Sequence, residues 1–461
     1  MLTYELKKVS GIPLYEALYR CIREDILSGK LAPGQKLPSK RALSANLKIS
    51  KITVEGAYQQ LLSEGYLRSV EKVGYFVEAV EHPAPVRSSW TPPVQEEANC
   101  IDLTANSPSY FPFSVWSRLS REVMQDLGET LLQSLPNQGV WELRAAICEH
   151  LAQFRGLQVD PENILIGAGT DFLYNLLVQL LGADRLYAVE EPGYEKIRQI
   201  YAAAGARCIG VGMDENGVLP QALKEAQVLH ISPSHHFPSG LITPLSRRQA
   251  LLDWAKPGNY IIEDDFDSEF RFAAHPMPTM KAMDTRGQVI YMNTFSKSLA
   301  PSIRISYMIL PDALMAQFRL RLGFYSCTVP SFEQYTLARF LQQGYFEKHI
   351  NRMRKAYRAR RNRILEIMKN CPLADRFTIR EENAGLHFLL QVDTALSDPE
   401  LTELCAQYGI RVRCLSDYYH GNAPAQVQHC LVINYSSLSD DALDALEQKL
   451  LQVHRRDAPT G

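Results

Sequence analysis

Several features that would assign a protein to a class at once are missing from this sequence. No run of 18 apolar residues occurs, and the N-terminal region holds no apolar core of a secretion signal, so the sequence predicts neither a membrane-spanning helix nor export. The nine cysteines are odd in number and scattered, and none forms a C-x-x-C pair. A disulfide framework and a zinc site are therefore not expected. The chain is predicted to be cytoplasmic, with no membrane partner and no bound metal.

A strong net charge is missing as well. The 461 residues have a formal net charge of −2, with 22% charged and 46% hydrophobic residues, as in an ordinary globular chain of two or three domains. The charge is unevenly placed, because residues 1–80 contain 12 Lys/Arg and 8 Asp/Glu, a net +4, which leaves −6 for the remainder. A basic N-terminal part joined to an acidic body is typical of a DNA-binding head on a second domain.

The N-terminal part has the sequence pattern of three helices and a hairpin. The expected helices are residues 14–28, 40–47 and 51–64, and the expected strands are residues 66–68 and 74–77. Ser39 and Ser50 stand where a side-chain oxygen caps the second and third helices, and the two strands enclose a basic turn at Lys72. This order predicts a winged helix-turn-helix DNA-binding domain over residues 1–80.

A proline-rich segment follows this domain. Residues 81–99 contain four prolines among polar residues, namely Pro83, Pro85, Pro92 and Pro93. That density of helix and strand breakers predicts a linker. About 17 residues at no more than ~3.3 Å each span about 55 Å, which would let the head reach well away from the body.

Residues 100–461 alternate between strand-like and helix-like segments. The strand candidates are residues 164–166, 186–189, 228–231, 260–262, 289–292 and 305–310. Alternation at this spacing predicts an α/β domain with a mainly parallel sheet and helices on both of its faces. Residues 331–368 are expected to form one long helix, and the tail to residue 450 a smaller C-terminal α/β lobe.

The body contains a lysine in a setting that suits covalent chemistry. The apolar run 289–292 leads to a turn that carries Thr294, Ser296 and Lys297. A lysine on a turn between buried strands is partly desolvated, which lowers its pKa and favours a Schiff base with an aldehyde. The two hydroxyls, together with Arg304, suit a phosphate group on the same ligand. Taken alone, Lys297 would be interpreted as an ordinary surface lysine.

Four carboxylates crowd the end of the apolar run at residues 260–262. They are Glu263, Asp264, Asp265 and Asp267. Carboxylates this close repel one another unless they share a cation, and a protonated pyridine nitrogen beside an ionised aspartate would serve as one. A solvated acidic turn and a metal site are the alternatives.

A glycine-containing turn supplies a candidate anion site. Gly167–Asp171 follows a strand candidate and opens a helix expected from Phe172, so the amides of Gly169 and Thr170 can face a phosphate. A glycine pair by itself usually marks only a turn. The hydroxyls and the arginine near Lys297 make a phosphate site the favoured interpretation.

The lysine and carboxylate segments together resemble a known family. Residues 263–270 and 294–297 are similar to the pyridoxal-phosphate motifs of the aminotransferase-like domain in MocR-type regulators, a branch of the GntR family. The resemblance implies a body with the fold-type I fold of pyridoxal-phosphate-dependent transferases. In such a body Lys297 would bind pyridoxal 5'-phosphate, Asp264 would face its pyridine nitrogen, and two bodies would form a homodimer.

By the same resemblance, two further segments contribute to the cofactor site. Tyr194 corresponds to the aromatic residue that stacks on the pyridine ring, and the alternative is a packed tyrosine at a strand end. Residues 234–240 resemble the loop under the cofactor's phenolic oxygen. Either His235 or His236 is expected to form a hydrogen bond there.

The N-terminal segments resemble the GntR-type winged helix throughout, so the resemblance covers nearly the whole chain. The implied DNA contacts, including two basic residues of the wing, are Ser39, Arg41, Ser50, Lys51, Thr53, Arg68 and Lys72. Lys51 stands where the family usually has an arginine, so the charge is kept but the bidentate geometry is lost. For each basic residue taken alone, a solvated surface charge is the alternative.

Three departures from the family pattern bear on function. Phe266 stands where the family usually has a tyrosine that donates to the phenolic oxygen, and Ser134 stands roughly where a tyrosine of the partner subunit reaches the phosphate. No motif identifies an arginine for a substrate carboxylate, and Arg411 and Arg413 are candidates. Electrostatic preorganisation is usually the largest catalytic contribution, so these departures count against turnover more than against cofactor binding.

The sequence therefore predicts a transcription factor that binds a double-stranded DNA operator. Its aminotransferase-like body is expected to bind pyridoxal 5'-phosphate and to sense an amine, an amino acid or the cofactor itself. A working aminotransferase that carries a DNA-binding head is the alternative, against which Phe266 counts mildly. In a third interpretation the body binds no cofactor, and Lys297 and Asp264 are relics.

Overall fold

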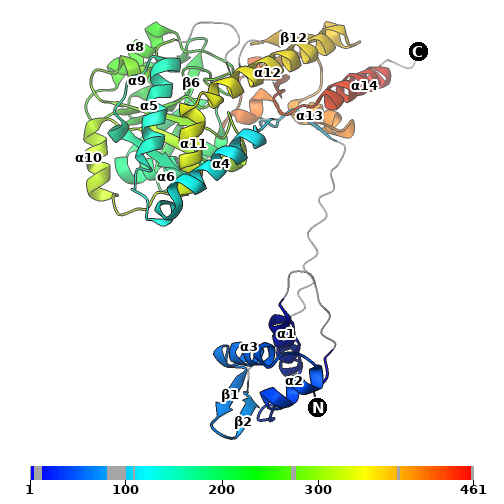
Figure 1. The fold of residues 1–461 in the computed structure, drawn as a ribbon. Helices are drawn as coiled ribbons and strands as arrows, with labels where there is room; N and C mark the ends of the chain where they lie inside the picture. The colour runs from blue at the N-terminus through cyan, green and yellow to red at the C-terminus, as the bar shows by residue number, and fades with distance from the viewer. Residues whose placement is uncertain are drawn as a thin grey trace. The chain divides into compact units, whose positions relative to one another are not determined.

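The computed structural model describes residues 2–4, 13–79, 100–106, 110–270, 277–381 and 385–457. The chain divides into two compact units, residues 1–96 and 97–461, which are described separately (Figure 1). The linker predicted over residues 81–99 lies outside the described residues. No helix among those residues is long and apolar enough to span a bilayer.

The N-terminal unit has the predicted winged helix-turn-helix fold. Its elements are α1 (Leu14–Leu27), α2 (Lys40–Leu47), α3 (Lys51–Ser63), β1 (Leu67–Val70) and β2 (Gly74–Val77). The helices bury one apolar face each in a shared core, because their apolar residues recur at helical spacing. The Ser39 side chain accepts a hydrogen bond from the Ala42 amide at 3.2 Å. Ser50 accepts one from the Thr53 amide at 3.1 Å, so both predicted N-caps are confirmed.

The C-terminal unit is built on an eight-stranded sheet with the order β4-β11-β10-β9-β8-β5-β6-β7. The strands are β4 (Ile164–Gly167), β5 (Leu186–Glu191), β6 (Arg207–Asp214), β7 (Gly217–Val218), β8 (Val228–Ile231), β9 (Tyr260–Asp264), β10 (Val289–Thr294) and β11 (Ser306–Ile309). Neighbouring strands from β10 to β6 are parallel. β11 is antiparallel to both β10 and β4, and β7 is antiparallel to β6. The prediction of a mainly parallel sheet is therefore confirmed.

Helices cover both faces of this sheet, as predicted (Figure 1). They are α4 (Phe113–Leu127), α5 (Trp141–Arg155), α6 (Thr170–Leu181), α7 (Glu195–Ala203), α8 (Leu245–Trp254), α9 (Met280–Met283), α10 (Asp312–Arg321), α11 (Ser331–Gln342) and α12 (Tyr345–Asn370). Ile290 and Met292 of β10 pack with α6, α7 and α10. Tyr291 packs on the opposite face with α5, α11 and α12. Successive side chains of a strand alternate between its faces, so one continuous apolar strand serves both helix layers.

The prediction of one long helix over residues 331–368 is wrong. The segment forms two helices, α11 and α12, which are separated at Gln343 and Gly344. Gly344 has φ +69°, in the left-handed region, which glycine adopts without the steric penalty of a Cβ atom. β6 was not among the predicted strands, because Gly210 and Gly212 weaken the strand pattern of its sequence.

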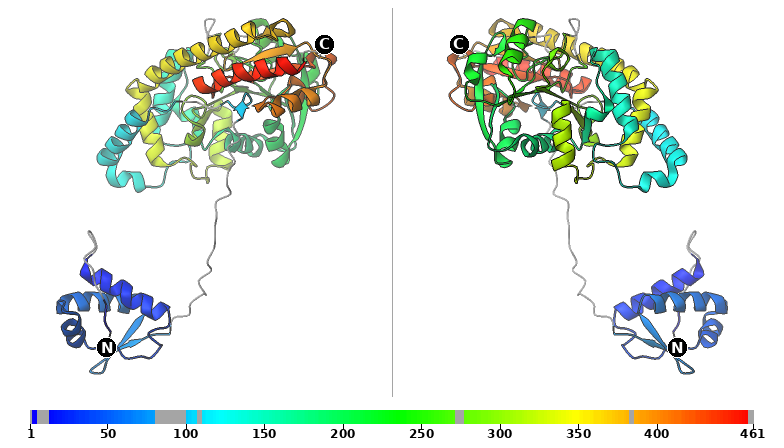
Figure 2. Two further views of the ribbon diagram at one scale, coloured as in Figure 1. Left: turned by 90° about the vertical axis from the view of Figure 1, so that its right-hand side faces the viewer. Right: turned by 90° about the vertical axis from the view of Figure 1, so that its left-hand side faces the viewer.

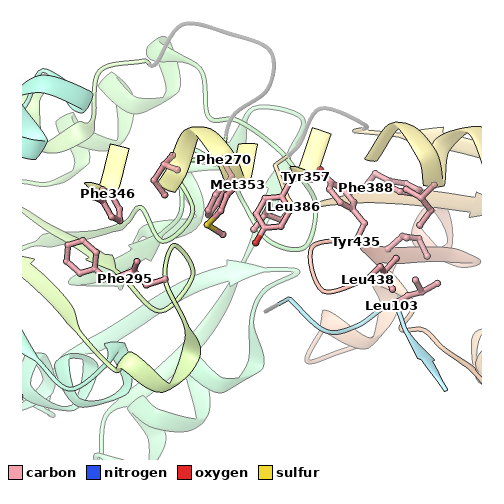
Figure 3. Close-up of a cluster of buried hydrophobic side chains, with 14 of the residues drawn as sticks. Leu103, Phe270, Phe295, Phe346, Met353, Tyr357, Leu386, Phe388, Tyr435 and Leu438 are labelled. Carbon is pink, nitrogen blue, oxygen red and sulfur yellow. The ribbon is translucent and has the colours of Figure 1, made fainter. Parts of the chain in front are cut away.

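The predicted C-terminal lobe packs against α12. Its elements are β12 (Phe377–Arg380), β13 (His387–Val392), β15 (Cys430–Asn434), α13 (Asp398–Gln407), α14 (Asp440–Asp457) and the short parallel pair β3 (Ile101–Asp102) and β14 (Ile410–Arg411). α14 lies beside α12 (Figure 2). Buried side chains run without a break from Phe346 past Tyr357 to Phe388 and Tyr435 (Figure 3). The lobe and the sheet domain therefore share one hydrophobic core.

Candidate cofactor site and DNA-binding surface

Five strand ends place the predicted cofactor residues at one edge of the sheet. β9 ends at Asp264, β10 leads to Lys297, and β4 leads to Gly169. β5 and β8 lead in the same way to Tyr194 and His235. These five strands run in one direction, since β11 is antiparallel to both β4 and β10. The carboxyl edge of such strands is where α/β sheets bind ligands.

Lys297 lies half-buried on the turn that follows β10. Its Nζ donates a hydrogen bond to the backbone oxygen of Asn106, 2.9 Å away. Burial lowers the pKa of the Lys297 ammonium, and the negative charge of Asp267 opposes that shift. A lowered pKa raises the fraction of neutral amine, which is the form that attacks a carbonyl carbon. The surroundings of Lys297 fit the covalent role predicted for it.

Asp264 is buried with only one carboxylate oxygen engaged. The Tyr174 hydroxyl donates to Oδ2 at 2.5 Å, and His230 Nε2 lies 3.4 Å from the same oxygen. Oδ1 is buried and has no hydrogen-bond partner among the described residues. A buried polar atom without a partner is costly. Oδ1 is therefore suited to accept a hydrogen bond from a ligand, as the predicted role at a pyridine nitrogen requires.

The groups behind Asp264 were not predicted from the sequence. Tyr201 Oη and His230 Nδ1 are 2.7 Å apart. His230 therefore connects Asp264 to a second tyrosine, Tyr201. Tyr174, Tyr201 and His230 come from α6, α7 and β8. The one available sequence signal was a histidine within the apolar run of β8.

Arg304 meets the turn after β4 at the predicted phosphate site. One guanidinium nitrogen lies 3.3 Å from the Ala168 backbone oxygen and 3.2 Å from an Asp171 carboxylate oxygen. Gly169 has φ +88°, and a Cβ atom there would lie 2.2 Å from that nitrogen. The arginine can therefore hold this position only beside a glycine. Thr170 begins α6, whose N-terminal amides and dipole attract an anion.

The two hydroxyls near Lys297 have different surroundings. Ser296 Oγ is buried and has no hydrogen-bond partner in the part of the chain that the structure describes. Thr294 Oγ1 accepts hydrogen bonds from Ser306 Oγ at 2.7 Å and from the Ser296 amide at 3.1 Å. Thr294 thus stabilises the turn, whereas the Ser296 hydroxyl is left available to a ligand.

His235 and His236 lie in different networks. A nitrogen of His235 contacts the Asp267 carboxylate, the group whose charge acts on Lys297. His236 instead contacts Ser239 Oγ at 2.6 Å and lies 3.5 Å from Glu190. Burial lowers the pKa of His236 to about 3 and raises the pKa of Glu190 to about 8, so both are uncharged at neutral pH. Of the two histidines, His235 is therefore the one that contacts a carboxylate acting on Lys297.

Tyr194 and the two candidate arginines differ in what they contact. The Tyr194 ring is 52% exposed and meets Phe237 edge-to-face at 6.4 Å. Arg411 pairs with Asp102 at 3.0 Å. Arg413 lies over the Tyr418 ring at 5.6 Å. Phe237 also packs on Tyr418 at 5.3 Å, so contacts through Tyr418 and Phe237 connect Arg413 to Tyr194.

Two of the four crowded carboxylates, Glu263 and Asp265, have separate partners within the protein. Glu263 accepts hydrogen bonds from the amides of Met280 and Lys281, each at 2.8 Å. Asp265 pairs with Arg155 at 2.8 Å. Successive residues point to different sides of the sheet, which separates these side chains. The described residues contain no group of three or more His, Cys, Asp or Glu side chains arranged to hold a metal.

The predicted DNA contacts of the head include both unpaired and paired cations. Neither Arg41 nor Lys51 lies within 4 Å of a carboxylate in the described residues, and both are exposed. Lys72 is exposed at the turn of the wing, with φ +60°. Arg68, in contrast, pairs with Glu78 at 3.0 Å. Its charge is therefore partly neutralised within the head.

The groups at the carboxyl edge fit pyridoxal 5'-phosphate. Lys297 supplies an amine with a lowered pKa, and Asp264 Oδ1 supplies a buried acceptor without a partner among the described residues. Ser296 Oγ supplies a hydroxyl in the same condition. Arg304 supplies a cation, and its guanidinium lies so close to Gly169 that a side chain at position 169 would collide with it.

Two family models match the chain, one for each unit. Residues 14–77 match "Bacterial regulatory proteins, gntR family", and residues 98–450 match "Aminotransferase class I and II". Among solved structures, a kynurenine aminotransferase of Pyrococcus horikoshii shares 24% identity with a TM-score of 0.67, covering 79% of this chain and 92% of that one. An archaeal alanine:glyoxylate aminotransferase shares 23% with a TM-score of 0.68, covering 78% and 92%. These structures show the fold of the C-terminal unit.

Curated relatives match along almost the full chain. The HTH-type transcriptional regulator YdeL of Bacillus subtilis is 39% identical over 91% of this chain and 93% of its own length. The pyridoxine biosynthesis transcriptional regulator PdxR of Corynebacterium glutamicum is 32% identical over 92% of both chains. The probable rhizopine catabolism regulatory protein MocR of Rhizobium meliloti is 31% identical over 91% and 90%. The chain belongs to the MocR-type transcriptional regulators, in which a GntR-type DNA-binding domain precedes an aminotransferase class I and II domain.

Proposed function

We propose that this regulator holds pyridoxal 5'-phosphate on Lys297 and senses a primary amine or an amino acid there. The observation that carries the proposal is the pairing of an amine of lowered pKa at Lys297 with the unpartnered oxygen of Asp264, in the part of the chain that the structure describes. The cofactor supplies an aldehyde that reacts reversibly with primary amines and a ring that withdraws electrons. The ligand state of the body then sets the operator affinity of the head.

Each residue of the site has a definite task in this proposal. Lys297 offers a neutral amine because burial lowers its pKa. Asp264 holds a proton on the ring nitrogen, and the hydrogen bond from Tyr174 keeps its carboxylate in place. Ser296 and Arg304 anchor the phosphate, and the Tyr194 ring, which is 52% exposed, stacks on the pyridine ring.

Phe266 favours sensing over turnover. It is half-buried and carries no hydroxyl, so it cannot donate to the phenolic oxygen as the usual tyrosine does. A sensor requires only that its ligand bind one conformation of the body better than the other. The second candidate, a working aminotransferase, is favoured by the same Lys297 and Asp264 that support cofactor binding.

The body is proposed to act as a homodimer. Four large apolar side chains in the described part of the body are at least 76% exposed, namely Phe113, Leu132, Leu320 and Phe324. Two of them, Phe113 and Leu132, lie on segments that pack against α11, since α4 begins at Phe113 and contacts α11, and Ser331 Oγ of α11 donates to the Leu131 backbone oxygen at 2.7 Å. A cavity of about 410 Å³ beside Arg304 is lined by Phe111, Phe113 and Trp116 among others. Exposed apolar surface of this kind marks an interface, and a second copy of the chain is the proposed occupant.

One experiment separates the sensor from the enzyme. Full-length wild-type protein and Phe266→Tyr are loaded with pyridoxal 5'-phosphate and mixed with a panel of amines and amino acids. The visible spectrum and the release of oxo acid are followed together. If the protein is a sensor, the wild type should show a rapid spectral change without release of oxo acid. The later steps of transamination should be faster in Phe266→Tyr. Oxo acid production through many turnovers in the wild type would establish the enzyme instead.

A further inference from the structure

The first turn of α3 carries an aliphatic side chain that the fold leaves in solvent. Ile52 is 80% exposed, more than any other large hydrophobic residue in the described part of the N-terminal unit. The residues that α3 buries are Val54, Ala57, Tyr58 and Leu61, which lie on the opposite side of the helix. Single exposed apolar residues are common on protein surfaces, so the exposure of Ile52 acquires meaning only from its position.

That position is fixed by the cap of the helix. Ser50 Oγ accepts a hydrogen bond from the Thr53 amide at 3.1 Å and lies 2.8 Å from Thr53 Oγ1. Two of the three hydroxyls predicted to contact DNA, those of Ser50 and Thr53, are therefore bonded to each other in the cap. Lys51 and Ile52 are the exposed side chains that project from the turn between them.

The charges around Ile52 identify the partner surface. Lys51 adjoins Ile52, and Arg41 lies on α2 of the same helix-turn-helix. Both are exposed cations, with no carboxylate within 4 Å among the residues that the structure describes. Lys40 differs, because it pairs with Glu55 at 2.5 Å. Unpaired cations that flank the first turn of a recognition helix match phosphates on both sides of a major groove.

We propose that Ile52 contacts the C5 methyl group of a thymine in the operator and so sets base preference at that position. The N-terminal residues of a recognition helix meet base edges, and the thymine methyl is the apolar group that these edges offer in the major groove. The purines present polar atoms in the major groove, which an isoleucine would bury without a hydrogen bond, and cytosine carries only a hydrogen at C5. The inference rests on operator binding by the head, and it names a residue that determines specificity.

The test uses a base that differs from thymine only in the methyl group. Full-length protein selects duplexes from a random library, and the enriched duplex is resynthesised with each thymine replaced singly by deoxyuridine. Wild-type protein, Ile52→Ala and Val73→Ala are then titrated with every duplex. Val73 is the matched control, since it is a 50% exposed aliphatic residue of the head that lies on the wing and not on α3.

Burial of one methyl group corresponds to about a fourfold change in affinity. Replacing the thymine that Ile52 contacts with deoxyuridine should weaken binding by the wild-type protein about fourfold. Ile52→Ala should bind the unmodified duplex about fourfold more weakly than the wild type does. Its affinity should not change when deoxyuridine replaces the same thymine. Val73→Ala should lose as much affinity on that replacement as the wild type does. The proposal is overturned if no thymine of the selected duplex is sensitive to its methyl group, or if Ile52→Ala keeps the full sensitivity. Failure to enrich any duplex would contradict operator binding itself.

Discussion

The two binding surfaces of this chain are built in opposite ways. The proposed DNA surface of the head comes largely from one short stretch, residues 39–53, in which Arg41 and Lys51 are exposed. The proposed cofactor site gathers residues from five strand ends, and all of them except Tyr194 and Arg304 are buried or half-buried. Exposed charges act nearly independently and are screened by salt. Buried polar groups are coupled through their hydrogen bonds, so a substitution at one of them also changes the interactions of its neighbours.

The largest expected effect is at Lys297. Lys297→Ala should abolish the visible absorbance of the protein-bound cofactor, because no other amine can replace its Nζ at that position. Absorbance after borohydride reduction and mass mapping of the modified peptide provide the measurement.

Lys281→Gln is the matched control for Lys297→Ala. Lys281 is also a half-buried lysine whose pKa is lowered, but its Nζ bonds the Val289 backbone oxygen, at the start of β10. This variant should keep the absorbance. Retention of the reduced adduct in Lys297→Ala would show that the covalent assignment is wrong.

The next largest effect is expected at Gly169. In Gly169→Ala the new Cβ atom would displace the Arg304 guanidinium, and a forced shift of this kind costs about 1–3 kcal/mol. Cofactor affinity, measured by equilibrium dialysis, should fall about 10- to 100-fold. Gly156→Ala is the control, since Gly156 also has positive φ but a Cβ there meets nothing within 4 Å. Equal losses in both variants would mean that only backbone strain matters.

A smaller effect is expected from the hydroxyl behind Asp264. Tyr174→Phe removes the hydrogen bond to Oδ2, and a hydrogen bond to a charged group is worth about 1.5–3 kcal/mol. Cofactor affinity should fall about tenfold, and the absorbance should change its pH dependence. Tyr187→Phe is the control, because its hydroxyl bonds the Gly182 backbone oxygen at 3.1 Å, away from the site. The same loss of cofactor affinity in both variants would show that the Tyr174 hydroxyl has no specific role in cofactor binding.

The smallest effects are expected in the head, where they should also be additive. Arg41→Ala and Lys51→Ala should each weaken operator binding and flatten the dependence of log Kd on log salt by about one unit. Lys40→Ala and Arg68→Ala should change that slope less, since both cations are already paired with carboxylates. Fluorescence anisotropy over a salt series provides the measurement. Equal slopes for all four variants would contradict the distinction between paired and unpaired cations.

The two surfaces also differ in how far the sequence predicts them. The caps at Ser39 and Ser50 and the strands that carry Asp264 and Lys297 follow from local patterns, and the structure has them where the patterns place them. The contact between Lys297 Nζ and the Asn106 backbone oxygen joins segments 191 positions apart. No local pattern encodes such a contact, and the same holds for Tyr174 and His230 behind Asp264.

The sequence also does not predict which surface cations form ion pairs or where a long helix is interrupted. Whether Arg68 is free or paired depends on the register of the wing, which brings Glu78 to it. The break between α11 and α12 depends on one left-handed residue, Gly344, within an otherwise helical pattern. Glycine is tolerated inside helices at a cost of about 0.5–1 kcal/mol, so its presence alone does not locate a break.

In the proposed function, the body senses an amine through Lys297 and passes that state to the head. The direct measurement is operator affinity, determined for the full-length wild type and Lys297→Ala with and without each amine of the panel. We expect one class of amine to shift the wild-type Kd, and we expect Lys297→Ala to bind the operator without responding to any amine. An undiminished response in Lys297→Ala would contradict the proposed function.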